Sequence, residues 1–97
     1  MLNMETARRI GINACIDKLG REFVLLHRDT ATSAYGETEN GVFCFVGVDT
    51  NYVSQNNNEV LVLDGNTQCQ YRVSCNVNPQ TGEVQFIECV LPEVVSI

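Results

Sequence analysis

The first 19 residues carry apolar side chains at the spacing of an amphipathic helix. Five of them fall on one side of a wheel with 3.6 residues per turn: Met4, Ile12, Cys15, Ile16 and Leu19. Beside them runs a strip of small residues four positions apart, Ala7, Gly11 and Cys15, which allows close approach to a sheet. Gly20 is a natural end for the helix. The pattern predicts a helix over about residues 4–19.

Residues 21–30 leave two alternatives open. The run from Phe23 to Leu26 is apolar without alternation, so its periodicity does not separate a short helix from a strand. We expect a second short helix that packs back on the core.

From residue 31 onward the pattern is that of β-strands separated by turns. Asn40-Gly41 favours a tight hairpin turn, and Pro79 to Gly82 forms a second short connection. The Asn-rich segment 49–59 reads as a loop. The strands are expected at about 32–37, 42–48, 60–64, 68–78 and 83–91, followed by a tail over 92–97.

Two of these strands differ in their patterning. Residues 42–48 are apolar on both faces, which is typical of a central strand covered on both sides. Residues 68–78 alternate, as a half-solvated antiparallel strand does. If the Pro79 connection sets the register, Cys75 faces Phe86 and Arg72 faces Cys89. Cys89 would then lie on the opposite face of the sheet from Cys75.

The order of the elements predicts an α+β fold. A helix followed by successive hairpins gives an N-terminal helix, with or without a short second helix, on one face of an antiparallel meander of four or five strands. The length of 97 residues fits a single domain.

The segment from Tyr71 to Val84 resembles the terminal hairpin of PepSY-type domains. In that family a Tyr-x-Val strand leads into a Thr-Gly-Glu-Val turn, and here the matching residues are Tyr71-Arg72-Val73 and Thr81-Gly82-Glu83-Val84. The resemblance implies a cystatin- or PepSY-like helix across an antiparallel sheet. It also implies a role in restraining peptidases or in binding peptides, and it transfers no site residues.

The charge of the chain narrows the range of partners. Twelve acidic residues oppose six basic ones, a formal net charge of −6. Binding of nucleic acids and of anionic membranes depends on clustered Lys and Arg, so neither is expected. The start of the chain has no secretory signal pattern, and no apolar run approaches the length of a membrane helix. We therefore expect a cytoplasmic protein.

Five cysteines and a single histidine, His27, invite a metal or thiol site. The closest cysteines, Cys69 and Cys75, are six positions apart on one strand, or about 20 Å at ~3.3 Å per residue, too far for one zinc ion. A thiol enzyme would need Cys15 or Cys44 beside His27, with Asp29 as a third group, and no local signature supports this. We expect no catalytic residues, no metal and no cofactor, and leave open whether any cysteine is reactive.

These observations favour a non-enzymatic protein-interaction module that binds a partner protein or a second copy of itself. The apolar tail residues Val94, Val95 and Ile97 are a candidate interaction surface. The alternative is a small-ligand or peptide-binding domain that uses a cup between helix and sheet. The candidate lining of that cup is aromatic: Phe43, Phe45, Tyr71 and Phe86.

Overall fold

The computed structural model describes residues 2–49 and 70–92. The predicted strand at 60–64, nearly all of the predicted loop at 49–59 and of the tail at 92–97, and the candidate surface Val94, Val95 and Ile97 lie outside the described residues.

The N-terminal helix is defined by a cap at each end. α1 (Met4–Leu19) begins after Asn3, whose side-chain oxygen accepts a hydrogen bond from the backbone N–H of Thr6 at 2.8 Å. It ends at Gly20, whose φ of 109° favours glycine and whose N–H donates to the carbonyl of Ile16. The predicted helix over 4–19 is therefore confirmed.

The expected second short helix is also confirmed. α2 (Arg21–Leu26) follows Gly20 directly, and a short 3₁₀ turn, η1 (Arg28–Thr30), leads into the sheet. Phe23 packs on Tyr71 in an edge-to-face arrangement with ring centroids 5.5 Å apart. Leu25 and Leu26 point outward and are 60% and 78% exposed, so only part of the apolar run reaches the core.

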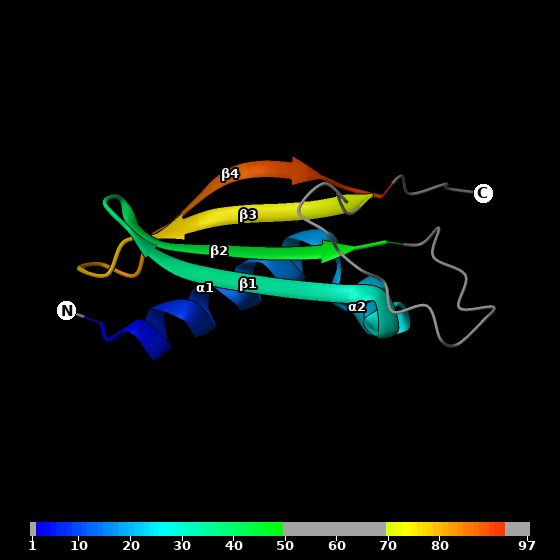
Figure 1. Ribbon diagram of the computed structural model, residues 1–97, viewed down its shortest axis with the longest axis horizontal. Helices are drawn as coiled ribbons and strands as arrows, with labels where there is room; N and C mark the ends of the chain where they lie inside the picture. The colour runs from blue at the N-terminus through cyan, green and yellow to red at the C-terminus, as the bar shows by residue number, and fades with distance from the viewer. Residues whose placement is uncertain (1, 50–69, 93–97) are drawn as a thin grey trace.

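The described strands form one antiparallel meander (Figure 1). They are β1 (Ala31–Thr38), β2 (Gly41–Val48), β3 (Tyr71–Val77) and β4 (Val84–Val90), and they lie in the sheet in sequence order. β2 is a central strand, as its two-sided apolar pattern predicts. β1 and β4 form the two edges of this sheet. The predicted architecture, a helix on an antiparallel meander, is confirmed.

Helix α1 lies across one face of the sheet, mainly against β2 and β3 (Figure 1). Its buried residues are spaced four apart: Ala7, Gly11, Cys15 and Leu19. The centre of the buried face is thus the strip of small residues, while Ile12 and Ile16 are only partly buried beside it. The fully buried side chains of the sheet opposite are themselves small, chiefly valines and cysteines. This small-to-small contact brings α1 close to the strands.

The pairing of β3 with β4 begins as predicted and then shifts. Cys75 faces Phe86, but Ser74 faces Glu88, so Ile87 on β4 is an extra residue without a partner on β3. Beyond this bulge Cys89 faces Val73 rather than Arg72. The predicted pairing of Arg72 with Cys89 is therefore wrong, and Cys89 lies on the same face of the sheet as Cys75.

Candidate functional site

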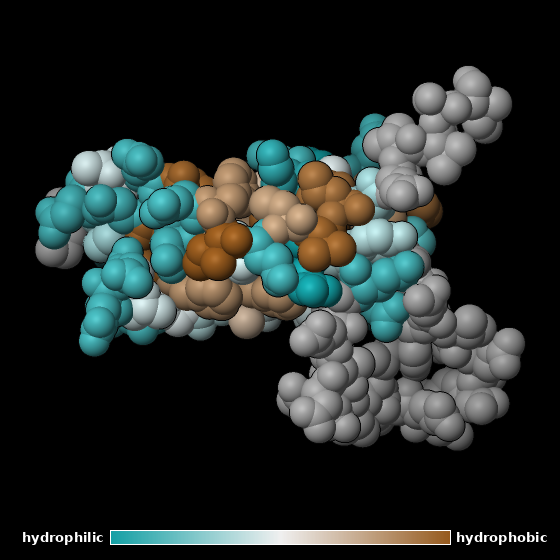
Figure 2. Space-filling view, turned by 90° about the horizontal axis from the view of Figure 1, so that it is seen from above, coloured by the Kyte–Doolittle hydropathy of each residue, from teal (hydrophilic) through white to brown (hydrophobic). Residues whose placement is uncertain are grey.

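The β4 edge carries several large apolar side chains that are exposed. Phe86, Ile87 and Leu91 are 41%, 56% and 41% exposed, although they belong to or directly follow a strand of the sheet. Figure 2 looks onto this edge from above the view of Figure 1 and shows apolar side chains gathered along its middle, with polar ones around them. We call Phe86, Ile87 and Leu91, together with the outer backbone of β4, the β4 edge.

The bulge changes which residues of β4 lie on each face of the sheet. Phe86, opposite Cys75, lies on the face that α1 covers, and Lys18 of α1 reaches over its ring at 5.5 Å from the centroid. Glu88, opposite Ser74, lies on the other face of the sheet. There its carboxylate accepts a hydrogen bond from the guanidinium of Arg72 at 2.9 Å. The charged groups next to the edge are thus engaged with residues of the protein itself.

The β1 edge is different. Its eight residues pair with β2 without a bulge, and its exposed side chains are mostly polar or small. The large one, Tyr35, is partly covered by Arg8 of α1, whose guanidinium carbon lies 5.1 Å from the ring centroid. Of the two edges, β4 alone presents several large exposed apolar side chains.

Beneath α1, three thiols from three elements come together. Cys15 of α1, Cys44 of β2 and Cys75 of β3 are completely buried, and Cys44 and Cys75 are direct cross-strand partners. The sulfurs of Cys15 and Cys75 are 3.6 Å apart. The Cys75 thiol also lies 3.6 Å from the carbonyl oxygen of Gly11. We call these three residues the thiol cluster.

The environment of the thiol cluster shifts the pKa values of its members in different directions. Donation of a hydrogen bond to Cys75, together with burial, raises the pKa of Cys15 far above its ordinary value. Burial, followed by the charge of a Cys75 thiolate, raises the pKa of Cys44 to about 11. For Cys75 the hydrogen bond from Cys15 lowers the pKa against the opposing effect of burial. Cys75 is therefore the most acidic of the three.

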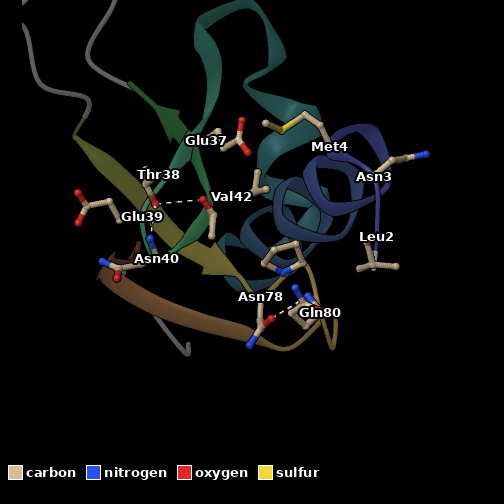
Figure 3. Close-up of a pocket in the computed structure, with 12 residues that line it drawn as sticks. Leu2, Asn3, Met4, Glu37, Thr38, Glu39, Asn40, Val42, Asn78 and Gln80 are labelled. Carbon is tan, nitrogen blue, oxygen red and sulfur yellow. Dashed lines mark hydrogen bonds between the residues drawn. The ribbon is translucent and has the colours of Figure 1, made fainter.

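A shallow hollow of about 590 Å³ lies where the start of α1 meets the turns after β1 and β3 (Figure 3). Its polar groups largely serve those turns. Thr38 Oγ1 donates to the carbonyl of Gly41, and Asn78 Oδ1 accepts from the backbone N–H of Gln80 at 2.8 Å. Glu37 and Glu39 add negative charge to the hollow, which disfavours binding of an anion at the adjacent N-terminus of α1.

The structure does not bring the four candidate cup residues together. Tyr71 and Phe86 face α1, because they pair with Val48 and Cys75. Phe43 and Phe45 alternate with Cys44 along β2 and therefore point to the opposite face of the sheet. Between α1 and the strands the space is filled by the buried core, which includes the thiol cluster. The hollow at the start of α1 is lined by other residues.

The remaining candidates for chemistry are also apart. The ring of His27 packs against Phe23, with centroids 4.9 Å apart, at the end of α2, while Cys15 and Cys44 lie under the middle of α1. Across residues 2–49 and 70–92, no three His, Cys, Asp or Glu side chains are grouped so that they could hold a metal ion. Nor is any helix in these ranges long and apolar enough to cross a membrane.

Two features of interest were not singled out from the sequence, although signals for both were present. The adjacent apolar pair Phe86-Ile87 breaks alternation in the last strand of the meander, and that strand is an edge by its position. The thiol cluster could have been expected from the strip of small residues on α1, because that strip places Cys15 against small residues of the central strands.

Comparison with known proteins adds no relative: no family model, no curated protein and no solved structure matches this chain. The resemblance of residues 71–84 to PepSY-type hairpins therefore stays a prediction.

Proposed function

We propose that this protein is a non-enzymatic interaction module that binds an extended segment of a partner protein along the β4 edge. The observation that carries the proposal is the exposure of Phe86, Ile87 and Leu91 on a strand at the edge of the sheet. Solvent-facing edges are usually protected by charges, proline or bulges. β4 has a bulge and Glu88, but three large apolar side chains on or directly after the strand remain exposed.

Strand addition supplies both affinity and specificity at such an edge. The added segment would hydrogen-bond to the outer backbone groups of β4, and its side chains would contact the exposed apolar groups of the edge. Within the described part of the chain no strand lies beyond β4. Ile87, unpaired at the bulge, offers the largest exposed contact of the strand.

The charge of the chain favours a partner segment that combines apolar with basic residues. The net charge is −6, and Glu83 directly precedes β4. The two cations close to this strand are already engaged, since Lys18 lies over the Phe86 ring and Arg72 pairs with Glu88. Lys or Arg side chains on the partner would therefore meet a complementary field, which speeds association and gives specificity.

Self-association is the competing use of the same edge. A second copy would bring two chains of net charge −6 together, which opposes dimerisation at low ionic strength. Binding in a helix–sheet cup is the other alternative. It has less support, because Phe43 and Phe45 lie on the opposite face from Tyr71 and Phe86.

Selection from a library of random extended peptides tests the proposal. We expect wild-type protein to enrich peptides with alternating apolar residues and at least one Lys or Arg. Ile87→Glu should weaken their binding at least tenfold, because it places a charge in the centre of the contact. Binding should also slow amide hydrogen exchange in β4.

Ser33→Glu on β1 is the matched control, because it adds the same charge to an exposed position of the other edge. It should leave binding within about twofold. Failure to enrich any peptide, or equal binding by the Ile87→Glu variant, would contradict the proposal. Light scattering of the protein alone completes the test. A dimer that Ile87→Glu dissociates would identify a second copy as the occupant of the edge and overturn the choice of a heterologous partner.

A further inference from the structure

The thiol cluster has a geometry that packing alone does not require. Cys15 and Cys75 come from elements 60 residues apart in the chain, and their sulfur atoms face each other at 3.6 Å. Both side chains are completely buried, so the contact is held by α1 and β3 rather than by flexible surface groups. Closing this gap to a sulfur–sulfur bond of about 2.05 Å needs a movement of about 1.5 Å between two packed elements.

Cys75 has a second neighbour in the cluster, and the two possible pairs differ. Cys44 lies directly opposite Cys75 in the sheet, where the strand pairing fixes both backbones. A bond there would have to form within an intact ladder, whose geometry restricts the dihedral angle of about 90° that a disulfide prefers. Cys15 belongs to the helix layer, which can shift or rotate slightly over the sheet. The pair of Cys15 with Cys75 is therefore favoured.

We propose that Cys15 and Cys75 are a redox-active pair that forms an intramolecular disulfide on oxidation by peroxide. The Cys75 thiolate attacks hydrogen peroxide, giving a sulfenic acid and releasing hydroxide. The thiol of Cys15 then attacks the Cys75 sulfur, forming the disulfide and releasing water. Overall two thiols are oxidised, one peroxide is reduced, and two molecules of water leave.

The electrostatics of the cluster support these roles. The hydrogen bond from Cys15 favours the thiolate form of Cys75, against burial and against loss of the bond that the Cys75 thiol donates to the Gly11 carbonyl. Of the two thiols Cys75 is the more acidic, so it is assigned as the attacking group. Because the cluster is completely buried, peroxide reaches it only when α1 loosens from the sheet. The reaction is therefore slow compared with oxidation of an exposed thiol such as Cys89. Once formed, the bond ties α1 to β3 and closes that opening.

The test exposes the folded, reduced protein to hydrogen peroxide and maps the products by mass spectrometry. Remaining thiols are alkylated after unfolding. Cleavage after Lys18, Arg72 and Glu83 places Cys15 and Cys75 in separate peptides and separates Cys75 from Cys89. We expect a linked pair of peptides holding Cys15 and Cys75, lighter than the free pair by two hydrogens. The thermal midpoint should rise by roughly 5 °C or more, because the bond closes a long loop.

Three variants make the test specific. Cys15→Ala and Cys75→Ala should each abolish the linked product and the rise in midpoint. Cys44→Ala removes an equally buried thiol of the same cluster and should retain both. Mapping of the wild-type protein decides the question even where a variant fails to fold. A bond between Cys44 and Cys75, or oxidation confined to Cys89 with all three core thiols still free, would overturn the proposal.

Discussion

Two regions of the molecule distribute their apolar side chains in opposite ways. One is the layer between α1 and the sheet, and the other is the β4 edge. The layer is built from small residues, and its fully buried side chains are valine, cysteine and alanine. The large side chains Phe86, Ile87 and Leu91 lie instead at the edge and remain substantially exposed. Stability in this protein therefore depends on close approach of two elements, while the larger apolar side chains at the edge stay exposed to solvent.

The largest expected effect on stability is at Gly11, in the centre of the strip of small residues on α1. A Cβ there would lie 2.8 Å from a methyl group of Val77 and 2.9 Å from the Cβ of Cys44. We expect Gly11→Val to lower the free energy of unfolding by about 3 kcal/mol, because overpacking forces α1 away from the sheet. Urea unfolding followed by circular dichroism measures the loss.

Gly36 is the matched control for that substitution. It lies in β1, where an added Cβ would meet nothing within 4 Å. Gly36→Val should be neutral or stabilising by about 0.5 kcal/mol, since valine favours strands. Equal losses at the two glycines would show that close helix–sheet approach is not what stabilises the fold.

The thiol cluster adds a pH dependence that the β4 edge does not share. Burial raises the pKa of Cys44 from 9.0 to about 11. The contribution of Cys44 to the free energy of unfolding is thus fully present below pH 9, where the thiol is protonated in both the folded and the unfolded protein. This contribution is lost as the pH rises through 11, because the thiol of the unfolded chain releases its proton at lower pH. Each pKa unit corresponds to about 1.4 kcal/mol, so the loss approaches about 2.7 kcal/mol.

Urea unfolding at pH 8, 9, 10 and 11 in the presence of a reductant measures this dependence. The Cys44→Ala variant is the reference, since it lacks the Cys44 thiol and differs from the wild-type protein at no other position. We expect the wild-type protein to lose more stability than the variant over this range. Parallel curves would show that Cys44 titrates in the folded protein as it does in the unfolded chain.

The sequence predicts the helix-covered layer better than it predicts the edge. Asn3 and Gly20 mark the ends of α1, and the spacing of Ala7, Gly11 and Cys15 identifies the face that packs on the sheet. Local patterns are sufficient there because caps and helical periodicity act over a few residues.

The register beyond Cys75 could not be predicted, because a bulge depends on how two strands fit and not on a residue type. Counting back from the Pro79 turn gives correct partners only up to Phe86. The error moves Cys89 to the wrong face. The four residues predicted to line a cup are separated for a simpler reason. Alternation along β2 puts Phe43 and Phe45 on the opposite face of the sheet from Cys44, and the strip of small residues on α1 packs against the face that carries Cys44.

Two substitutions that shorten a side chain compare the helix-covered layer with the β4 edge directly. Val73 is completely buried under the helix layer, whereas Ile87 is 56% exposed on β4. Val73→Ala should cost about 2 kcal/mol of unfolding free energy, from lost burial and an incompletely closed cavity. Ile87→Ala removes a larger hydrocarbon group but should cost only about 0.5 kcal/mol, because much of that group already contacts water. Thermal and urea unfolding of both variants measure the contrast. If Ile87→Ala were as destabilising as Val73→Ala, Ile87 would be a structural residue, and its exposure would no longer support a binding role for the β4 edge.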